Sequence, residues 1–116
     1  MRSPDVRPDR HALLELAALL SEIEVLAAEG DRARFDAEPR CRWVLHRLWI
    51  AAGNEAQQFC LAIGASVDRA EPWSHLYRLR NVLAHTRLAD VDESDVWEAT
   101  TDRCASVRHR ARALLR

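Results

Sequence analysis

The chain has 116 residues, of which 17 are basic and 18 acidic, so its formal net charge at pH 7 is -1. This length predicts a single domain, residues 1–116, with its own hydrophobic core. All the basic residues are arginine, which excludes Schiff-base chemistry and phosphate loops that need lysine. The near-neutral charge excludes a protein that coats DNA by bulk charge, but it allows one basic surface balanced by acidic faces.

The first predicted element is an amphipathic helix over residues 9–29, because apolar residues recur there every three or four positions. The charged residues 1–8, which include two prolines, are expected to form a flexible N-terminus. Gly30 is a natural stop for the helix, and the polar stretch 31–38 predicts a connection. The expected core side of this helix consists of Leu13, Leu16, Ala17, Leu20, Ile23 and Leu26.

Two prolines mark the starts of the next two predicted helices. Pro39 suits the first turn of a helix over 39–63, and Pro72 opens a helix over 72–85. Gly53 lies inside the first of these, where it serves either a close approach between helices or a kink. The expected core residues of the two helices are Trp43, Leu45, Leu48, Trp49, Ala52, Ala56, Phe59, Ile63, Trp73, Leu76, Leu79 and Leu83.

The last predicted helix follows a short connection over 86–91, with Asp92 as its N-cap, and runs to the chain end. Four helices joined by short loops predict an all-α fold, an antiparallel four-helix bundle of the up-and-down type. The four tryptophans of the chain are interpreted as core residues. The expected core side of the last helix consists of Val96, Trp97, Cys104, Val107, Ala111 and Leu114.

Cysteine usage and hydropathy predict a cytoplasmic protein. Cys41, Cys60 and Cys104 form no C-x-x-C pair, so reduced thiols are expected and a zinc site is not. No stretch resembles a signal peptide or a membrane span. His11 and His46 have no carboxylate or thiol at ligand spacing, so we predict neither a metal nor a cofactor.

Arginines are concentrated at the C-terminal end, where no acidic residue follows Asp102. Two interpretations stay open: a solvated helix end, where cations suit the helix dipole, or a nucleic-acid contact. The structural interpretation is the more economical. The basic residues concerned are Arg103, Arg108, His109, Arg110, Arg112 and Arg116.

The most informative segment is WSHLYRLRNVLAHTRLADVDESDVW, residues 73–97. Arg78, Arg80 and Arg87 surround His85 there, with no acidic residue between Glu71 and Asp90. Arginine binds a phosphodiester through its planar fork, and histidine transfers protons near neutral pH. This pattern suits RNA cleavage without metal, in which the ribose 2′-hydroxyl attacks phosphorus, so DNA would survive.

That reaction needs both an acid and a base, whereas the segment offers one histidine. A two-fold homodimer that brings two copies of the site together would supply both. The spacing of Arg80 and His85 places them about 140° apart on an ideal helix. They therefore share a face only if His85 lies at a helix end or the helix is distorted. Asn81 also suits a plain role in holding backbone carbonyls near the helix end, and Glu55 is expected to pair with an arginine of this helix.

The phrase RNVLAH, with the preceding Pro-Trp and the following VDESDVW, resembles the HepT-like branch of the HEPN superfamily. The similarity extends loosely from Leu13 to Leu115. It implies an all-helical homodimer and a metal-independent ribonuclease, often a toxin neutralised by a nucleotidyltransferase-type (MntA-like) antitoxin. By motif position, Arg80 and His85 would be catalytic and Asn81 would orient them. Arg78 and Arg87, which flank these residues, are expected to bind the nucleic acid.

One position departs from the family pattern. Many HepT-like toxins carry a tyrosine two residues after the motif histidine, which the antitoxin adenylylates, whereas this chain has Arg87 there. Tyr77 precedes the motif and is no obvious substitute. This favours neutralisation by occlusion, or a non-catalytic subunit that binds nucleotide, RNA or a nucleotidyltransferase. A third alternative is a helical interaction module in which Arg80 and Asn81 only brace the bundle.

Overall fold

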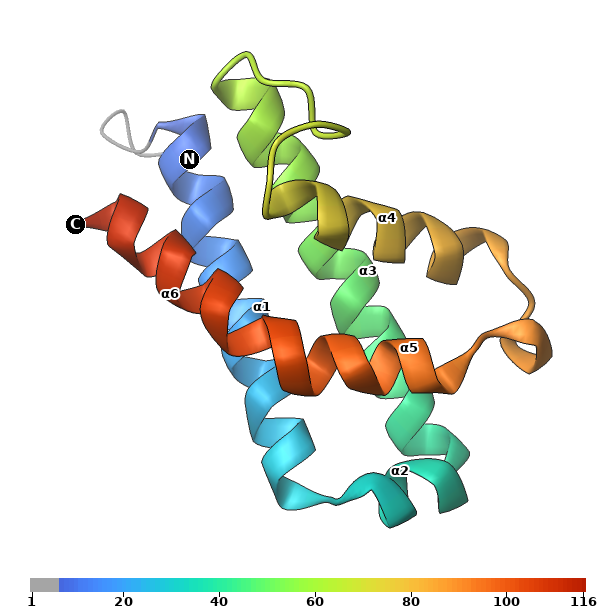
Figure 1. Cartoon of the computed structure of the whole chain (residues 1–116). Helices are drawn as coiled ribbons and strands as arrows, with labels where there is room; N and C mark the ends of the chain where they lie inside the picture. Colours follow the sequence, from blue (N-terminus) through green and yellow to red (C-terminus); the bar gives the residue numbers. More distant parts are fainter. Residues whose placement is uncertain (1–6) are drawn as a thin grey trace, which may run out of the picture.

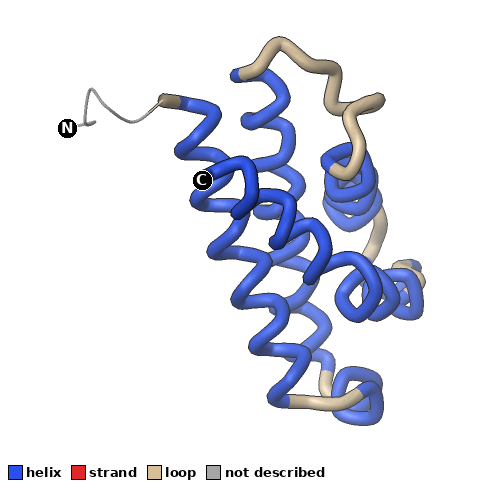
Figure 2. The backbone as a smooth tube through the Cα atoms, turned by 60° about the vertical axis from the view of Figure 1, so that its left-hand side comes forward, coloured by secondary structure: helices blue, strands red, loops and turns tan. Residues whose placement is uncertain are grey.

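The computed structural model describes residues 7–116, and every regular element in this part of the chain is helical (Figures 1 and 2). The predicted flexibility of the N-terminus concerns mainly residues 1–6, which lie outside the described residues. The elements in chain order are α1 (Pro8–Glu29), α2 (Arg32–Ala37), α3 (Pro39–Ala62), α4 (Trp73–His85), the 3-10 turn η1 (Leu88–Asp90), α5 (Glu93–Glu98), the π-helical segment η2 (Ala99–Arg103) and α6 (Cys104–Leu115).

The two longest helices, α1 and α3, lie side by side and run in opposite directions (Figures 1 and 2). Helix α4 packs against α3. The elements α5, η2 and α6 follow one another without a break, and this rod passes from α3 to α1 (Figure 1). The all-helical prediction is therefore confirmed. None of the helices in residues 7–116 is both long and apolar enough to cross a bilayer.

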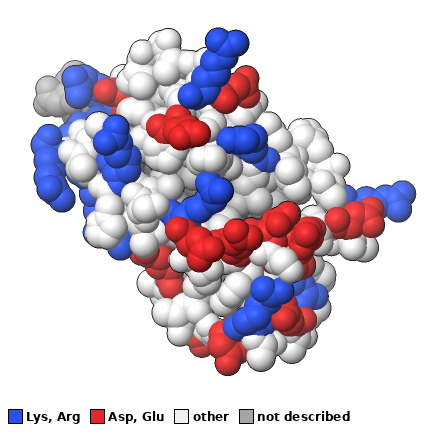
Figure 3. Space-filling view, viewed as in Figure 1, with Lys and Arg blue, Asp and Glu red and all other residues white. Residues whose placement is uncertain are grey.

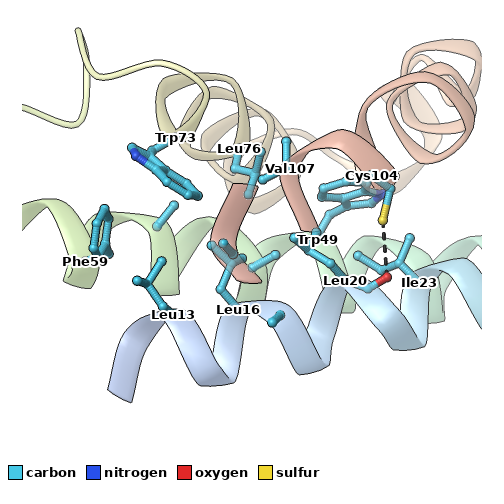
Figure 4. Packing of buried hydrophobic residues seen from close by; sticks show 14 of the residues in the cluster. Leu13, Leu16, Leu20, Ile23, Trp49, Phe59, Trp73, Leu76, Cys104 and Val107 are labelled. Carbon is cyan, nitrogen blue, oxygen red and sulfur yellow. Dashed lines mark hydrogen bonds between the residues drawn. The ribbon is translucent and has the colours of Figure 1, made fainter. Parts of the chain in front are cut away.

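The core forms where α1, α3, α4 and the rod meet. Leu16, Leu20 and Ile23 of α1 are fully buried, and the predicted apolar stripe of this helix accounts for them. Figure 4 shows them below Trp49, with Leu76 and Val107 covering the other side. One contiguous cluster thus holds the four parts together.

Two tryptophans, Trp49 and Trp73, are buried as predicted, and Trp97 is partly buried against Phe35. The prediction is wrong for Trp43, which is 51% exposed. Trp43 lies about 200° around α3 from the buried Leu45, so the two cannot share a face. The apolar surface predicted for this helix was therefore too wide.

Two further core predictions are wrong at element ends. Ile63 is 50% exposed because α3 ends at Ala62, one residue before it. Leu114 is 45% exposed, and its neighbour Leu115 packs against the core instead. The spacing of apolar residues is a poor guide to the burial of a side chain that lies within one turn of a helix end.

The predicted connection 31–38 contains a short helix, α2. Asp31 caps it, since its Oδ1 accepts a hydrogen bond from the backbone N–H of Arg34 at 2.9 Å. Only Phe35 of this helix is buried, and its ring centroid lies 5.0 Å from that of Trp97. A single large apolar residue gives no periodic pattern, which is why the sequence did not predict a helix here.

The start of the last predicted helix is confirmed, but its continuity as an α-helix is not. Asp92 caps α5 through its Oδ1, which accepts from the backbone N–H of Ser94 at 3.0 Å. The hydrogen-bonding pattern then widens to a π-helix over Ala99–Arg103 before α6 begins. Such π segments interrupt α-helices without ending them.

Candidate functional site

Helix α4 approaches α3 at Gly53. A Cβ atom at this position would lie 2.7 Å from the carbonyl oxygen of Leu76 and would overlap the side-chain stem of Arg80. Real Cβ atoms do not come so close to neighbouring atoms, so only glycine permits this contact. Of the two roles predicted for Gly53, the structure shows the close approach between helices.

The Arg80 guanidinium is held by amides from both helices. Its Nε donates to Oδ1 of Asn54 on α3 at 2.8 Å, and its Nη1 donates to Oδ1 of Asn81 on α4 at 2.9 Å. Both acceptors are neutral, and no carboxylate among residues 7–116 forms an ion pair with Arg80. The arginine is thus fixed in place while its positive charge and its remaining N–H groups stay available for an anion.

Asn81 connects Arg80 with the face that carries His85. Residues four apart on a helix are neighbours, with Cβ atoms about 5–6 Å apart, so Asn81 and His85 share one face. Arg80 itself lies about 140° around the helix from His85. Its bond to Asn81 directs the guanidinium toward the shared face.

The spacing of Arg80 and His85 allows them to share a face if His85 lies at a helix end. The structure shows that His85 is the last residue of α4. Its imidazole is exposed to solvent, and no hydrogen bond joins it to Arg80. The predicted Arg80 and Asn81 are therefore directly bonded. His85 lies one turn further along, open to a ligand.

The two predicted nucleic-acid contacts lie outside this cluster. Arg78 is exposed, with its Nη2 donating to Nδ1 of His75 at 3.2 Å and its Nε to the carbonyl of Ser74 at 3.4 Å. Arg87 is exposed in the extended connection after α4. Neither arginine shares a hydrogen-bond partner with the Arg80 guanidinium.

Asn54 is the residue that sequence reasoning missed. Its signal was a Gly-Asn pair inside a helix, where both residue types have low helix propensity. The prediction that the next residue, Glu55, pairs with an arginine of α4 is wrong. No ion pair of 4.0 Å or less joins Glu55 to an arginine within residues 7–116. Burial raises the pKa of its carboxyl, Glu15 on α1 raises it further, and His11 on α1 lowers it.

The C-terminal arginines serve partly as links between α6 and α1. Nε of Arg108 lies 2.6 Å from Oε2 of Glu24, and Nη2 of Arg112 donates to Oγ of Ser21 at 3.2 Å. An arginine of α1 also bonds to α6, since Nη1 of Arg10 donates to the carbonyl oxygen of Leu115 at 2.8 Å. For Arg108 and Arg112 the structural interpretation is therefore the one that the contacts support.

No cluster of three or more histidine, cysteine, aspartate or glutamate side chains suited to a metal ion occurs in the part of the chain that the structure describes. Comparison with protein-family models, with curated proteins and with solved structures gave no match.

Proposed function

We propose that this chain is a metal-independent endoribonuclease, the toxin of a toxin–antitoxin pair, with Arg80, Asn81 and His85 in its active site. One observation carries the proposal. An arginine is fixed by two neutral amides with its charge uncompensated, and one of these amides, Asn81, lies one helical turn from an exposed histidine. This combination suits a phosphodiester, which needs charge stabilisation and proton transfer.

The reaction assigns a different task to each residue. His85 accepts the proton of the ribose 2′-hydroxyl while its oxygen attacks the adjacent phosphorus. Arg80 donates hydrogen bonds to the phosphoryl oxygens and stabilises the charge that develops on them. The bond to the 5′-oxygen breaks, a protonated imidazole gives that oxygen its proton, and the products are a 2′,3′-cyclic phosphate and a 5′-hydroxyl.

A homodimer would complete this site. One chain supplies one motif histidine, and a two-fold axis beside α4 would add the second as the acid. We propose that α1, α3, α4 and the α5–η2–α6 rod form the antiparallel four-helix bundle of an HEPN-like protein, with the α4 motif facing the partner. Arg78 and Arg87 would then bind flanking phosphates of the RNA.

A nucleotidyltransferase-type (MntA-like) protein is the proposed antitoxin, and the pair would act in the cytoplasm. Arg87 occupies the position of the usual tyrosine, so this toxin offers no hydroxyl there for adenylylation. Neutralisation would then depend on occlusion of Arg80 and His85. Mutation of the antitoxin surface that contacts α4 should then abolish inhibition. Mass spectrometry should find no adenylate on the toxin. Both results would support neutralisation by occlusion.

The test is cleavage of labelled single-stranded RNA and of matched DNA in EDTA. We expect RNA alone to be cleaved, with cyclic phosphate ends. His85→Ala and Arg80→Ala should each reduce the rate about 100-fold to 10,000-fold, the usual contribution of such groups. His109→Ala, which removes an exposed histidine of α6, is the matched control and should cleave normally.

Thermal melting of the same variants, followed by circular dichroism, distinguishes a catalytic role of Arg80 from a purely structural one. Under the proposal Arg80→Ala stays folded and inactive, whereas in a purely structural role it melts well below the unaltered chain because the network with Asn54 and Asn81 is lost. Cleavage retained by highly purified His85→Ala would reject the proposed site.

The alternative is a non-catalytic HEPN-like subunit that binds RNA, a nucleotide or a nucleotidyltransferase. Arg87 in place of the usual tyrosine favours it, because it removes one feature of the catalytic toxins. It predicts stoichiometric binding, no turnover, and weaker binding of RNA by Arg80→Ala at unchanged fold.

A further inference from the structure

A groove of about 290 Å³ lies between α4 and the α5–η2 rod. Helix α4 packs mainly against α3, so this other side of it is left open. Leu79 and Ala99 supply the apolar part of the lining, and all the other lining side chains are ionisable. Figure 3 views this side of the molecule and shows an acidic band with basic side chains beside it.

Charges of opposite sign are separated along the groove. Helix α4 and the rod run in opposite directions (Figure 1), so the early α4 residues His75 and Arg78 lie beside Arg103, which ends η2. The carboxylates Asp95 and Glu98 precede Arg103 on the rod by one to two turns. The groove therefore has a basic end and an acidic end.

His75 belongs to the basic end, and its surroundings favour the neutral imidazole. Its Nδ1 accepts a hydrogen bond from Arg78, a donor-only group, so the proton of the neutral ring lies on Nε2, 3.8 Å from Oε1 of Glu71. Burial lowers the pKa of the His75 imidazole, and the charges of Arg103 and Arg78 lower it further, against the opposing effect of Glu71.

The two ends do not neutralise each other. Within residues 7–116, no ion pair of 4.0 Å or less joins Arg78 or Arg103 to Asp95 or Glu98. Two arginines and two carboxylates give this lining a formal charge of zero. A ligand with one charge of each sign therefore matches both ends of the groove.

We propose that this groove binds a small zwitterion of the amino-acid class, with its carboxylate on Arg78 and Arg103 and its ammonium on Asp95 and Glu98. The planar arginine fork suits a carboxylate, and the carboxylates of the rod accept from an ammonium. The volume is near the lower end for ligand sites, which fits a molecule of this size. Arg80 bonds to α3 on another side of α4, so the inference does not depend on ribonuclease activity.

The experiment is a titration of the full chain with three probes of equal length, followed by NMR of the Leu79 and Ala99 amides. 6-Aminohexanoate carries both charges, hexanoate only the negative one and hexylamine only the positive one. We expect 6-aminohexanoate to shift both amides saturably and to bind about tenfold more tightly than either singly charged probe. Shorter and longer ω-amino acids then measure the distance between the two ends.

Arg103→Gln and Glu98→Gln should each weaken binding of 6-aminohexanoate about tenfold, because each removes one charged partner. Arg110→Gln, on an exposed position of α6, is the matched control and should bind normally. Equal binding of all three probes, or no saturable shift with any ω-amino acid at concentrations on the order of 10 mM, would overturn the proposal. So would an RNA oligonucleotide that shifts both amides when the ω-amino acids do not.

Discussion

The three cysteine thiols have very different surroundings. Cys104 is fully buried, its Sγ donates to the carbonyl of Leu20 at 3.2 Å, and burial, with a smaller contribution from Glu24, raises its pKa to about 12. Burial also raises the pKa of Cys60, whereas Cys41 is partly exposed near the start of α3. Since the thiolate is the reactive form, the raised pKa values of Cys60 and Cys104 disfavour these two thiols, and its exposure favours Cys41 as the reactive one.

We therefore expect one thiol of the folded protein to react rapidly with Ellman's reagent at pH 8, and the other two to react only when the chain unfolds. Cys41→Ser should abolish the rapid phase. A rapid phase of two thiols, or modification of Cys104 found by mass spectrometry before unfolding, would contradict the burial described above.

A buried hydroxyl at Thr100 connects α3 with the rod. Its Oγ1 accepts from Nε1 of Trp49 at 3.0 Å and donates to the carbonyl of Val96 at 2.8 Å. Thr100→Val keeps the shape but leaves the indole N–H of Trp49 unpaired in the core, which costs about 1–3 kcal/mol. Urea unfolding measures this loss, and Thr100→Ser, which keeps the hydroxyl, should lose less. Equal stability of Thr100→Val and the unaltered chain would show that the bond contributes little.

At this scale the sequence predicted the residues of the motif but not all of their partners. Arg80 and Asn81 are adjacent in RNVLAH, so their pairing needed only local information. Asn54 lies 26 residues from Arg80, and its contact exists because Gly53 lets two helices meet at that point. No periodicity specifies which residue of one helix will face a given residue of another.

The contact between α3 and α4 depends on the missing side chain at Gly53. Gly53→Ala gains helix propensity of about 1 kcal/mol but places a methyl group against Leu76 and Arg80. Overpacking of this kind costs about 1–3 kcal/mol, and the helices must move apart. We expect a lower melting temperature together with reduced RNA cleavage, because Arg80 moves away from Asn54. Gln58→Ala, at an exposed position of α3, is the control and should not destabilise the chain.

The length of an element decided how well the sequence predicted it. The long helices α1, α3 and α4 end within one residue of their predicted boundaries because several turns of regular apolar spacing define each of them. Helix α2 has six residues and one buried side chain, and η2 changes the hydrogen bonding without changing the residue types. Neither leaves a pattern that a sequence can show.

Acid sensitivity of the whole fold should depend partly on His75. Its pKa in the folded chain is lowered, first by burial and then by Arg103 and Arg78, relative to the ordinary value of 6.5. Below pH 6.5 the unfolded chain therefore binds more protons at this residue than the folded one, and folding becomes less favourable as the pH falls.

We expect the urea midpoint to decrease between pH 7.5 and 5.5, and His75→Gln to reduce that decrease. His109→Gln, at an exposed position on α6, serves as the control and should leave the decrease unchanged. An equal decrease for His75→Gln and the unaltered chain would show that other groups account for the acid sensitivity.

At the scale of the molecule, the net charge of -1 conceals an uneven distribution. Composition predicted that basic and acidic surfaces could coexist, and Figure 3 shows acidic side chains in a band and basic ones mainly to one side of it. The sequence could not show that Arg108 is used internally, against Glu24, because 84 residues separate the two. Such pairs follow from how α6 docks on α1.

The π-helical turn over Ala99–Arg103 also determines which face of α6 points toward α1. Buried residues recur every fourth position through it, at Val96, Thr100 and Cys104, where an α-helix would drift by about 40° at each step. Deleting a single residue here and restoring ordinary helical winding would replace these eight steps, which make two full turns, by seven steps of about 100°, so α6 would turn by only about 20° relative to α1. Arg108 would then still face Glu24. The fold should therefore tolerate the loss of one residue from Ala99–Arg103 better than the loss of one residue within α6, where the rest of the helix would turn by about 100°, a contrast that melting curves of the two deletions would reveal.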